Sequence, residues 1–486
     1  MKPSLPSWLE ELCQRLSDND PSLTSIELTH PRIDDLGARA LAESLEDNTF
    51  VATLILSCYN IVDDGAYAIS SVLGDPSARA GQTITRLQFR ELRNSRDFVT
   101  FFKALCSNTR IEELSLRYSR VCLQGAVSFR KLLESHPRLH EVRLVDTQLS
   151  DGAIKEVCLG VGASPCIQRL FLVNAELEES DADHLANMLL DSRCGLRELH
   201  LAENDLGDAG AETIARALQS NESLRLLDLR SNEITENGAL AIQGLLVSSQ
   251  HLISLGLASN TLGSLGAAAL ARGLTHRNCV LQRLDLSDNE IGSGGACAFS
   301  HMLRYNQELV ELNLGQNQLG DVGIQALVSG IASNKTLRWL SLRRNGLTNR
   351  GAIAFADKLP RMQGLKELIL SKNMIDPIGA THLLKGLRSN VELEYLHLED
   401  GGGRSLSSLP VHKEISHWIR LNKAGRRIFR HTNNVPHPIW AMVYGRVTAD
   451  SNTLFHFLTS SPDVLEQRSE TKTPNISSKK RKSIAG

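Results

Sequence analysis

The chain has 486 residues, of which 42% are hydrophobic and 22% charged, and this is the balance of an ordinary globular protein. Its 53 basic and 55 acidic residues give a formal net charge of -2, so the overall charge gives no reason to expect nucleic acid or a membrane surface as partner. No apolar stretch reaches the roughly 18 residues of a membrane span, and the 9 cysteines form no C-x-x-C pair. We therefore expect reduced thiols in a cytosolic or nuclear protein, without disulfides or zinc.

The first residues form a short amphipathic segment. Trp8, Leu9, Leu12 and Leu16 fall on one helical stripe. The same region carries charges and lacks a continuous apolar run, so we do not expect a signal peptide. We expect residues 1–22 to form a helical N-terminal cap, because the open end of a repeat array exposes apolar surface.

From residue 23 onward the chain repeats one pattern, L-x-x-L-x-L-x-x-N-x-L. Seven clear units, about 28 residues apart, begin at Leu196, Leu224, Leu252, Leu281, Leu309, Leu337 and Leu365. Weaker copies begin at Leu23, Val51, Ile84, Ile111, Leu139 and Ile167, and a final half-unit begins at Leu393. We therefore expect a solenoid over residues 23–400, with about 13 repeats and a terminal strand. The longer step before Ile84 places an insertion near the turn-forming run Gly74–Ser77.

Each residue type in the unit has a physical reason. The Leu-x-Leu pair predicts a short strand with both side chains on the interior face. The asparagine, as at Asn204, ends the strand, and its amide can bond backbone groups that the turn leaves unpaired. The Gly-Ala step that follows, as at Gly210 and Ala211, should let a helix approach the sheet closely. The weak units are expected to be less regular because, in place of Asn, they carry Pro31, Tyr59, Leu92, Ser119, Thr147 and Ala175.

After Leu398 the composition changes. Residues 401–410 are a turn-rich linker, and residues 411–465 are expected to form a helical C-terminal cap. We expect three helices in this cap. The first contains Ile415, Trp418, Ile419 and Phe429, the second starts at Pro438, and the third follows an N-cap at Asp450 or Ser451. Residues 466–486 are polar, and we expect a disordered basic tail. Its run Lys479, Lys480, Arg481 and Lys482 is a candidate nuclear import signal in a cytoplasmic protein, and the alternative is a solubilising end.

The strand-plus-helix unit with its asparagine ladder resembles the ribonuclease-inhibitor-like class of leucine-rich repeats. The same class occurs in the repeat regions of NOD-like receptors and in Ran GTPase-activating protein. The resemblance covers residues 23–398 and implies an α/β solenoid, with a curved parallel sheet on the concave face and helices on the convex face. It is specific for fold and weak for function, because members share architecture and differ in partners.

We expect function on the concave face, where positions three, five, seven and eight of each unit should meet solvent over roughly 65 Å. The "early zone" is basic and aromatic, and consists of Arg86, Arg90, Arg117, Tyr118, Arg143, Arg169 and Phe171. The "middle zone" is acidic, and consists of Glu198, Glu203, Asp228, Asp285, Asp288 and Glu311, with Arg230 and Arg283 interspersed. The "late zone" is again basic and aromatic, and consists of Trp339, Arg343, Arg344, Ile369, Lys372, Tyr395 and His397.

Trp, Tyr and Arg dominate interface energies, so these side chains are the candidate partner-binding residues. They are the whole late zone together with Arg90, Arg117, Tyr118, Arg143 and Phe171, and Trp339 is the first to mutate. The alternative is that they are ordinary solvated strand positions, and for the middle zone we favour that alternative. RNA could contact interleaved basic and aromatic residues, but the acidic middle zone and the near-neutral charge disfavour it.

The sequence carries no catalytic signature. The motifs G-x-x-x-x-G-K-[ST], H-E-x-x-H and G-x-S-x-G are all absent, and Gly160–Gly162 lacks the third glycine of a dinucleotide-binding loop. His431 and His437 have no cysteine or acidic residue at ligand spacing, so we expect neither metal nor cofactor. We therefore predict a monomeric, non-catalytic scaffold or regulator with a protein partner on the concave face.

Three alternatives remain open. A GTPase activator similar to Ran GTPase-activating protein would need an exposed catalytic loop near the N-terminal repeats, and the basic tail counts against it because that family normally carries an acidic one. A second alternative is a sensing or regulatory repeat protein of the NOD-like-receptor type that lacks a nucleotide-binding domain. A ribonuclease inhibitor proper is disfavoured by the modest cysteine count and the mixed concave charge.

Overall fold

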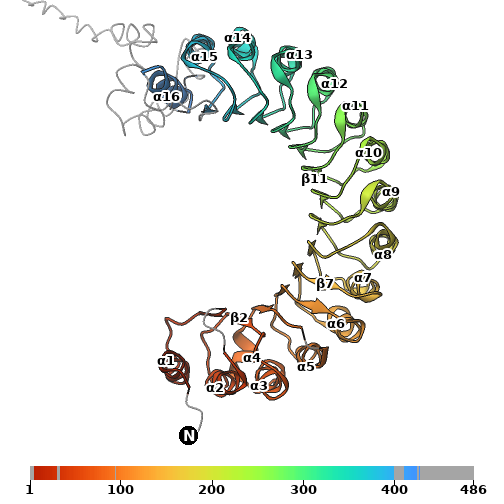
Figure 1. The fold of residues 1–486 in the computed structure, drawn as a ribbon, viewed down its shortest axis with the longest axis vertical. Coiled ribbons are helices and arrows are strands. Elements are labelled where there is room, and N and C mark those ends of the chain that lie inside the picture. Colours follow the sequence, from red (N-terminus) through yellow and green to blue (C-terminus); the bar gives the residue numbers. More distant parts are fainter. Residues whose placement is uncertain (1–4, 30–32, 94, 399–409, 424–425, 427–486) are drawn as a thin grey trace, which may run out of the picture.

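The computed structural model describes residues 5–29, 33–93, 95–398, 410–423 and 426. They form an open arc, with strands along the inner rim and helices along the outer rim (Figure 1). The inner rim is one 14-stranded sheet in which every neighbouring pair is parallel and the strand order follows the chain. The predicted α/β solenoid is therefore confirmed.

The strands of the sheet begin two residues after the predicted unit starts. They are β1 (Ser25–Leu28), β2 (Thr53–Ser57), β3 (Arg86–Arg90), β4 (Glu113–Arg117), β6 (Glu141–Val145), β8 (Arg169–Val173) and β9 (Glu198–His200). The seven clear units, which form the regular half of the arc, begin with β9. They continue with β10 (Leu226–Asp228), β11 (Ser254–Gly256), β12 (Arg283–Asp285), β13 (Glu311–Asn313), β14 (Trp339–Ser341) and β15 (Glu367–Ile369), and the terminal strand is β16 (Tyr395–His397). A separate pair, β5 (Arg120–Val121) and β7 (Gln148–Leu149), lies outside this sheet and was not predicted.

The helices of the first half are α1 (Ser7–Ser17), α2 (Asp35–Leu45), α3 (Asp63–Gly74), α4 (Arg79–Thr83), α5 (Ser95–Leu105), α6 (Leu123–Ser135), α7 (Ala153–Ala163) and α8 (Ala182–Leu190). Those of the second half are α9 (Gly207–Leu218), α10 (Glu236–Ser248), α11 (Gly263–Leu274), α12 (Gly292–Tyr305), α13 (Gly320–Ser333), α14 (Asn349–Lys358), α15 (Pro377–Ser389) and α16 (Pro410–Lys423). The insertion expected near residues 74–77 is a turn followed by the extra helix α4, which was not foreseen.

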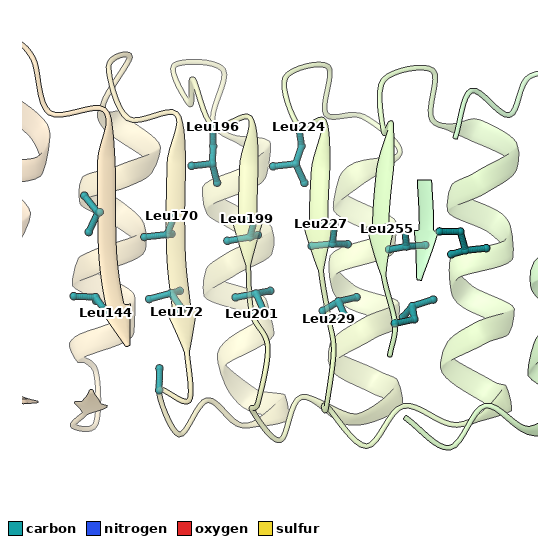
Figure 2. Packing of buried hydrophobic residues seen from close by; sticks show 14 of the residues in the cluster. Leu144, Leu170, Leu172, Leu196, Leu199, Leu201, Leu224, Leu227, Leu229 and Leu255 are labelled. Atoms are coloured by element: carbon teal, nitrogen blue, oxygen red, sulfur yellow. The ribbon is translucent and has the colours of Figure 1, made fainter. Parts of the chain in front are cut away.

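The core lies between the two rims. Leu199, Leu227 and Leu255 pair in register on β9, β10 and β11, so equivalent leucines form rows along the arc. Figure 2 shows these rows, with the side chains standing between the strands and the helices. Each of these leucines is at most 1% exposed, and burying one contributes roughly 1.5–3 kcal/mol.

The predicted asparagine ladder is present in the seven clear units. Asn317 is fully buried, and its Oδ1 accepts hydrogen bonds from the backbone N–H groups of Asn289 (2.9 Å) and Ile291 (3.3 Å). Its Nδ2 donates to the carbonyl oxygens of Leu286 (2.8 Å) and Gly315 (3.0 Å). Because each asparagine bonds the backbone of the preceding repeat, the ladder joins successive units.

A second polar ladder runs where each helix meets the next strand, and the sequence analysis missed it. Asn334 donates to the carbonyl oxygens of Leu303 (2.8 Å) and Asn306 (2.9 Å), and its Oδ1 accepts from the N–H of Leu337 (2.7 Å). Related side chains lie at Asn48, Asn108, His136, Asn221, Ser249, Asn306 and Asn390. The signal is visible in the sequence as a polar residue three positions before the first apolar residue of a unit.

The Gly-Ala step has a different role from the one expected. A Cβ at Gly266 would lie 3.1 Å from Leu262, 3.2 Å from the Ala239 Cβ and 3.2 Å from the Glu236 Cα. Glu236 and Ala239 belong to the neighbouring helix α10, so the glycine lets helices of adjacent repeats approach each other rather than the sheet.

Helices cover both described ends of the arc. In α1, Leu9 and Leu16 are 1% exposed, while Trp8 and Leu12 are partly buried against the core. In α16, Ile415 and Ile419 are buried, and Asn422 donates to the carbonyl of Leu393 (2.8 Å). The division at residues 22 and 400 stays a prediction. Phe429, Pro438, Asp450, His431, His437 and the tail lie outside the described residues.

Candidate functional site

The concave side of the sheet is open along the arc (Figure 1). Most residues at positions three and five are at least partly exposed, as predicted, but Glu141, Asp228 and Ser341 are only 3%, 7% and 5% exposed, and position seven meets solvent only in part. Ala202, Ala258 and Ser371 hold position seven and are 1%, 6% and 7% exposed. The expectation was wrong there because the strand bends into the asparagine turn and takes small side chains inward.

Position five carries a stacked row across four strands. The Arg143 guanidinium lies 3.8 Å from the Phe171 ring centroid, and the Phe171 and His200 rings are parallel at 4.1 Å. His200 Nδ1 is 3.6 Å from Asp228, whose carboxylate binds Arg230 at 2.8 Å. Each member holds its neighbour, so this part of the surface is fixed before any partner arrives.

Asp228 was expected to be exposed but is only 7% exposed. Burial opposes its ionisation, yet hydrogen bonds from His200 and Arg230 outweigh burial and lower its pKa to about 2. The carboxylate therefore stays charged and engaged at neutral pH, so it is a structural anchor rather than a free acidic contact.

The row stops at Gly256, the position-five residue of β11. A hollow of about 290 Å³ opens over it, with walls that include Asp228, Asp285, Arg283 and Trp339. A Cβ at Gly256 would lie 2.8 Å from Asp228 Oδ1, so only glycine leaves this space free. Gly256 was not predicted as a site residue, although it is the only glycine at position five of a clear unit.

Trp339 is half-buried rather than fully exposed, and it forms one wall of this hollow. Arg343 and Ile369 are half-buried, whereas Arg344 and Lys372 are exposed. Arg344 Nη1 donates to Gln316 Oε1 (3.3 Å). Within the described part of the chain, the ion pairs do not include Arg343, Arg344 or Lys372, so these three cations are available to a partner.

The late zone ends on an aromatic pair. Tyr395 and His397 are exposed and parallel, with ring centroids 6.4 Å apart. His397 Nε2 is 3.1 Å from Glu367, and the Lys423 ammonium of α16 lies 3.4 Å from the Tyr395 ring centroid. The structure thus groups the late zone along β14, β15 and β16, with α16 at its border.

The early zone is less basic than its arginines suggested. Arg86 pairs with Glu113 (3.1 Å), and Arg117 with Asp146 (3.6 Å). Glu141 pairs with Arg143 and, at 2.6 Å, with Arg169. Arg90 and Tyr118 remain available to solvent, with the Arg90 guanidinium 5.3 Å from the Tyr118 ring centroid.

The middle zone combines paired and free carboxylates. Asp285 accepts from the Ser287 N–H (2.9 Å) and hydroxyl (2.7 Å), and Glu198 lies 3.7 Å from His200. Glu203 and Asp288, at position eight, are exposed. Their backbone φ values are 61° and 58°, in the left-handed region, so the turn directs these side chains to the edge of the sheet.

All 9 cysteines are free thiols. Burial raises the pKa of Cys58, Cys158 and Cys194, so these thiols stay protonated at neutral pH. In the residues that the structure describes, no three His, Cys, Asp or Glu side chains are grouped so as to hold a metal ion. Over the same residues, no helix combines the length and apolar character that crossing a membrane requires.

Comparison with known proteins agrees with the repeat geometry. A family model described as "Leucine Rich repeat" matches residues 19–42, 195–215, 220–242, 248–271, 277–300, 305–328 and 333–356. Ribonuclease inhibitor of Sus scrofa is 28% identical over 217 residues, which are 42% of this chain and 40% of that protein. The matched segments are leucine-rich repeats, and the chain is similar to ribonuclease-inhibitor-like members of that class. This leucine-rich repeat protein spans less than half of the length of the curated relatives that it matches.

Two further similarities are more limited. A protein phosphatase 1 regulatory subunit 37 homolog of Caenorhabditis briggsae is 26% identical over 139 residues, covering 28% of this chain and 15% of that protein. An internalin from Listeria monocytogenes aligns in structure over 81% of this chain and 94% of its own, with 17% identity and a TM-score of 0.43.

Proposed function

We propose that this leucine-rich repeat protein is a non-catalytic scaffold or regulator that holds a protein partner on its concave face, with the late zone as the main contact. The observation that carries the proposal is the position of Trp339. Its ring walls the hollow over Gly256 together with Arg283, and the same repeat carries Arg343 and Arg344, which take part in no ion pair among the described residues. An indole beside arginines at the edge of a hollow is the arrangement that provides interface hot spots.

The rigidity of the surface supports the proposal. Buried ladders hold every strand of the regular half, and the row from Arg143 to Arg230 fixes the concave side chains. A surface that is ordered before binding loses little conformational entropy on association. The late zone would therefore suit a partner that offers an apolar side chain for Trp339 and carboxylates for Arg343 and Arg344.

The names of two relatives are consistent with this role. One is called an inhibitor of ribonuclease, and another a regulatory subunit homolog of a phosphatase. Both names describe proteins that act on another protein. We carry over only this general mode of action, because both alignments cover a minority of the relative.

A photo-cross-linking experiment tests the proposal. A photoreactive amino acid replaces Trp339 in one version of the chain and Leu265 in a control version. Leu265 is 72% exposed and lies on α11 of the convex side, so it matches an accessible apolar position outside the proposed surface. We expect a discrete cross-linked partner from position 339 only. With that partner purified, Trp339→Ala should weaken binding about 30-fold, the cost of a hot-spot residue. The same yield from both positions, or an unchanged affinity, would contradict the proposal.

The rival GTPase-activator function has its own assay. The chain is added to a panel of small GTPases, and phosphate release is followed over time. We expect no acceleration, and stimulation of any of them would replace the scaffold proposal with the activator one.

A further inference from the structure

The strand ends of the early repeats differ from those of the regular half. After β3 and β4 the buried asparagine is missing, and Ser119 instead accepts the N–H of Leu92 (3.1 Å). The backbone N–H of Arg120 donates to the Leu92 carbonyl (3.0 Å), and that of Gln148 donates to the Ser119 carbonyl (3.0 Å). Together with β5 and β7, these bonds hold position ten of successive repeats in a row along the edge of the arc.

The row begins with two exposed arginines, Arg93 and Arg120. Neither takes part in an ion pair among the residues that the structure describes. Tyr118, which is 44% exposed, lies between two guanidinium groups, 5.3 Å from Arg90 and 5.5 Å from Arg117. Of the two site arginines, Arg93 lies with its guanidinium 6.0 Å from the Tyr59 ring centroid, and an uncharged ring leaves the charge of the arginine unneutralised.

A hollow of about 450 Å³ opens along the row, and Arg93, Arg120, Tyr118 and Gln148 line its basic and neutral part. Two carboxylates, from later repeats, also line it. Asp146 is engaged by Arg117 (3.6 Å) and Asn174 (3.0 Å), and Glu176 by Gln148 (2.7 Å).

The sign of the charge changes along the row. From the early to the middle repeats, position ten is held by Arg93, Arg120, Gln148, Glu176, Asp205 and Glu233. All six are exposed. A ligand lying along this row therefore meets cations first and carboxylates two repeats later.

We propose that this edge binds a phosphorylated segment of a protein partner, with the phosphate on Arg93 and Arg120 and a Lys or Arg of the same segment on Glu176. Planar guanidinium forks bind phosphate oxygens in pairs, which makes two free arginines a suitable phosphate site. Arg120 and Glu176 are two repeats apart, or roughly 10 Å at the spacing of neighbouring strands. An extended peptide covers that distance in about three residues.

The change of sign also decides between a phosphopeptide and a nucleic acid. A single-stranded RNA continues with one phosphate per nucleotide, so its next phosphates would lie on Glu176 and Asp205. A segment that carries one phosphate and a cation matches both halves of the row. The inference rests on the proposed function in one respect, because it assumes a protein partner, but it uses none of the late zone.

Fluorescence anisotropy with labelled short peptides and the full chain tests the inference. One peptide has phosphoserine with an arginine three residues before it, and another has the arginine three residues after it. Each has a twin without the phosphate and a twin with glutamate in place of arginine. We expect one of the phosphorylated, arginine-containing peptides to bind with a Kd of about 10–100 μM, and each twin to bind at least tenfold more weakly.

Variants then locate the site. Arg93→Ala with Arg120→Ala should weaken binding of the phosphopeptide at least tenfold. The matched control, Arg216→Ala with Arg277→Ala, removes two other exposed arginines and should change nothing. Thermal unfolding of both double variants verifies that they fold.

The outcomes separate this inference from the proposed function. Trp339→Ala should leave peptide binding unchanged, whatever its effect on the cross-linked partner. Equal binding of the unphosphorylated twin, no binding of any peptide, or an unchanged affinity of the Arg93/Arg120 variant would each overturn the inference. So would a short oligouridylate that binds more tightly than the peptides and loses affinity in that variant.

Discussion

Replacing Asn317 with alanine tests whether the asparagine ladder carries the stability of the regular half. The side chain is fully buried and makes four hydrogen bonds to the backbone. Alanine leaves the N–H groups of Asn289 and Ile291 and the carbonyls of Leu286 and Gly315 without this partner. A buried unpaired polar group costs about 1–3 kcal/mol. The Gly315 carbonyl keeps its bond from the Asp288 N–H (2.9 Å), so at about 1 kcal/mol for each of the other three groups we expect a loss of about 3 kcal/mol.

Asn313→Ala is the matched control. Asn313 is an asparagine on β13 of the same repeat, is half-buried, and accepts one hydrogen bond, from the Gly315 N–H (3.1 Å). Its removal should cost about 1 kcal/mol or less. Free energies of unfolding come from urea titration of both variants.

Because repeat arrays can open locally, amide hydrogen exchange is measured beside the titration. We expect Asn317→Ala to speed exchange at Asn289 and Ile291 while leaving the early repeats unchanged. A loss no larger than that of Asn313→Ala, or undiminished protection of the two amides, would show that water or a shift of the chain replaces the side chain.

Two further predictions concern pH and localisation. Burial lowers the pKa of His136 to about 4, below its ordinary value, so the unfolded chain binds this proton more readily than the folded chain. The free energy of unfolding should therefore fall as pH drops from about 7 to 5, by about 1.5 kcal/mol for this group. Urea titrations of His136→Asn, which introduces the ladder residue of other repeats, should show a smaller fall over the same pH range. An equal fall in the variant and the unchanged chain would contradict the role of His136. Replacing residues 479–482 by alanine should move a fluorescent fusion from the nucleus towards the cytoplasm, and an unchanged distribution would favour a solubilising tail.

The strands were predictable because their determinants are local. Every predicted unit start precedes a strand by two residues, as Leu224 precedes β10. The asparagine ladder was predictable for the same reason, since residue type and spacing together imply its bonds. The second ladder was equally visible three residues before most units but was overlooked, because Asn, His and Ser all perform that role.

The charge state of the surface was less predictable because it depends on neighbours 28 residues away. Arg143 and Arg169 were counted as free cations, whereas both are paired with Glu141 on β6, which cancels one of their two charges. Glu141 holds position three of its unit, so comparing the charges at positions three and five of neighbouring strands would have predicted this pairing. Asp228 can be buried in its charged form because the Arg230 side chain folds back onto it. Residue type alone does not specify that position of Arg230.

The constant register of the second half has a consequence for how such an arc can change in length. Leu227 faces Leu255 and Leu255 faces Leu284, although the second step is one residue longer. The extra residue is taken up between α11 and β12, where His276 and Cys279 close a turn (3.0 Å) away from the asparagine ladder that ends the strands. A whole unit inserted between β11 and β12 would thus exchange the buried bonds across that junction for equivalent ones and add one strand spacing, roughly 4.8 Å. It would move the late zone away from the edge that carries Arg93 and Arg120 without altering either surface. The number of repeats therefore sets the distance between these two surfaces, and so the distance between the two segments of a partner that could bind both.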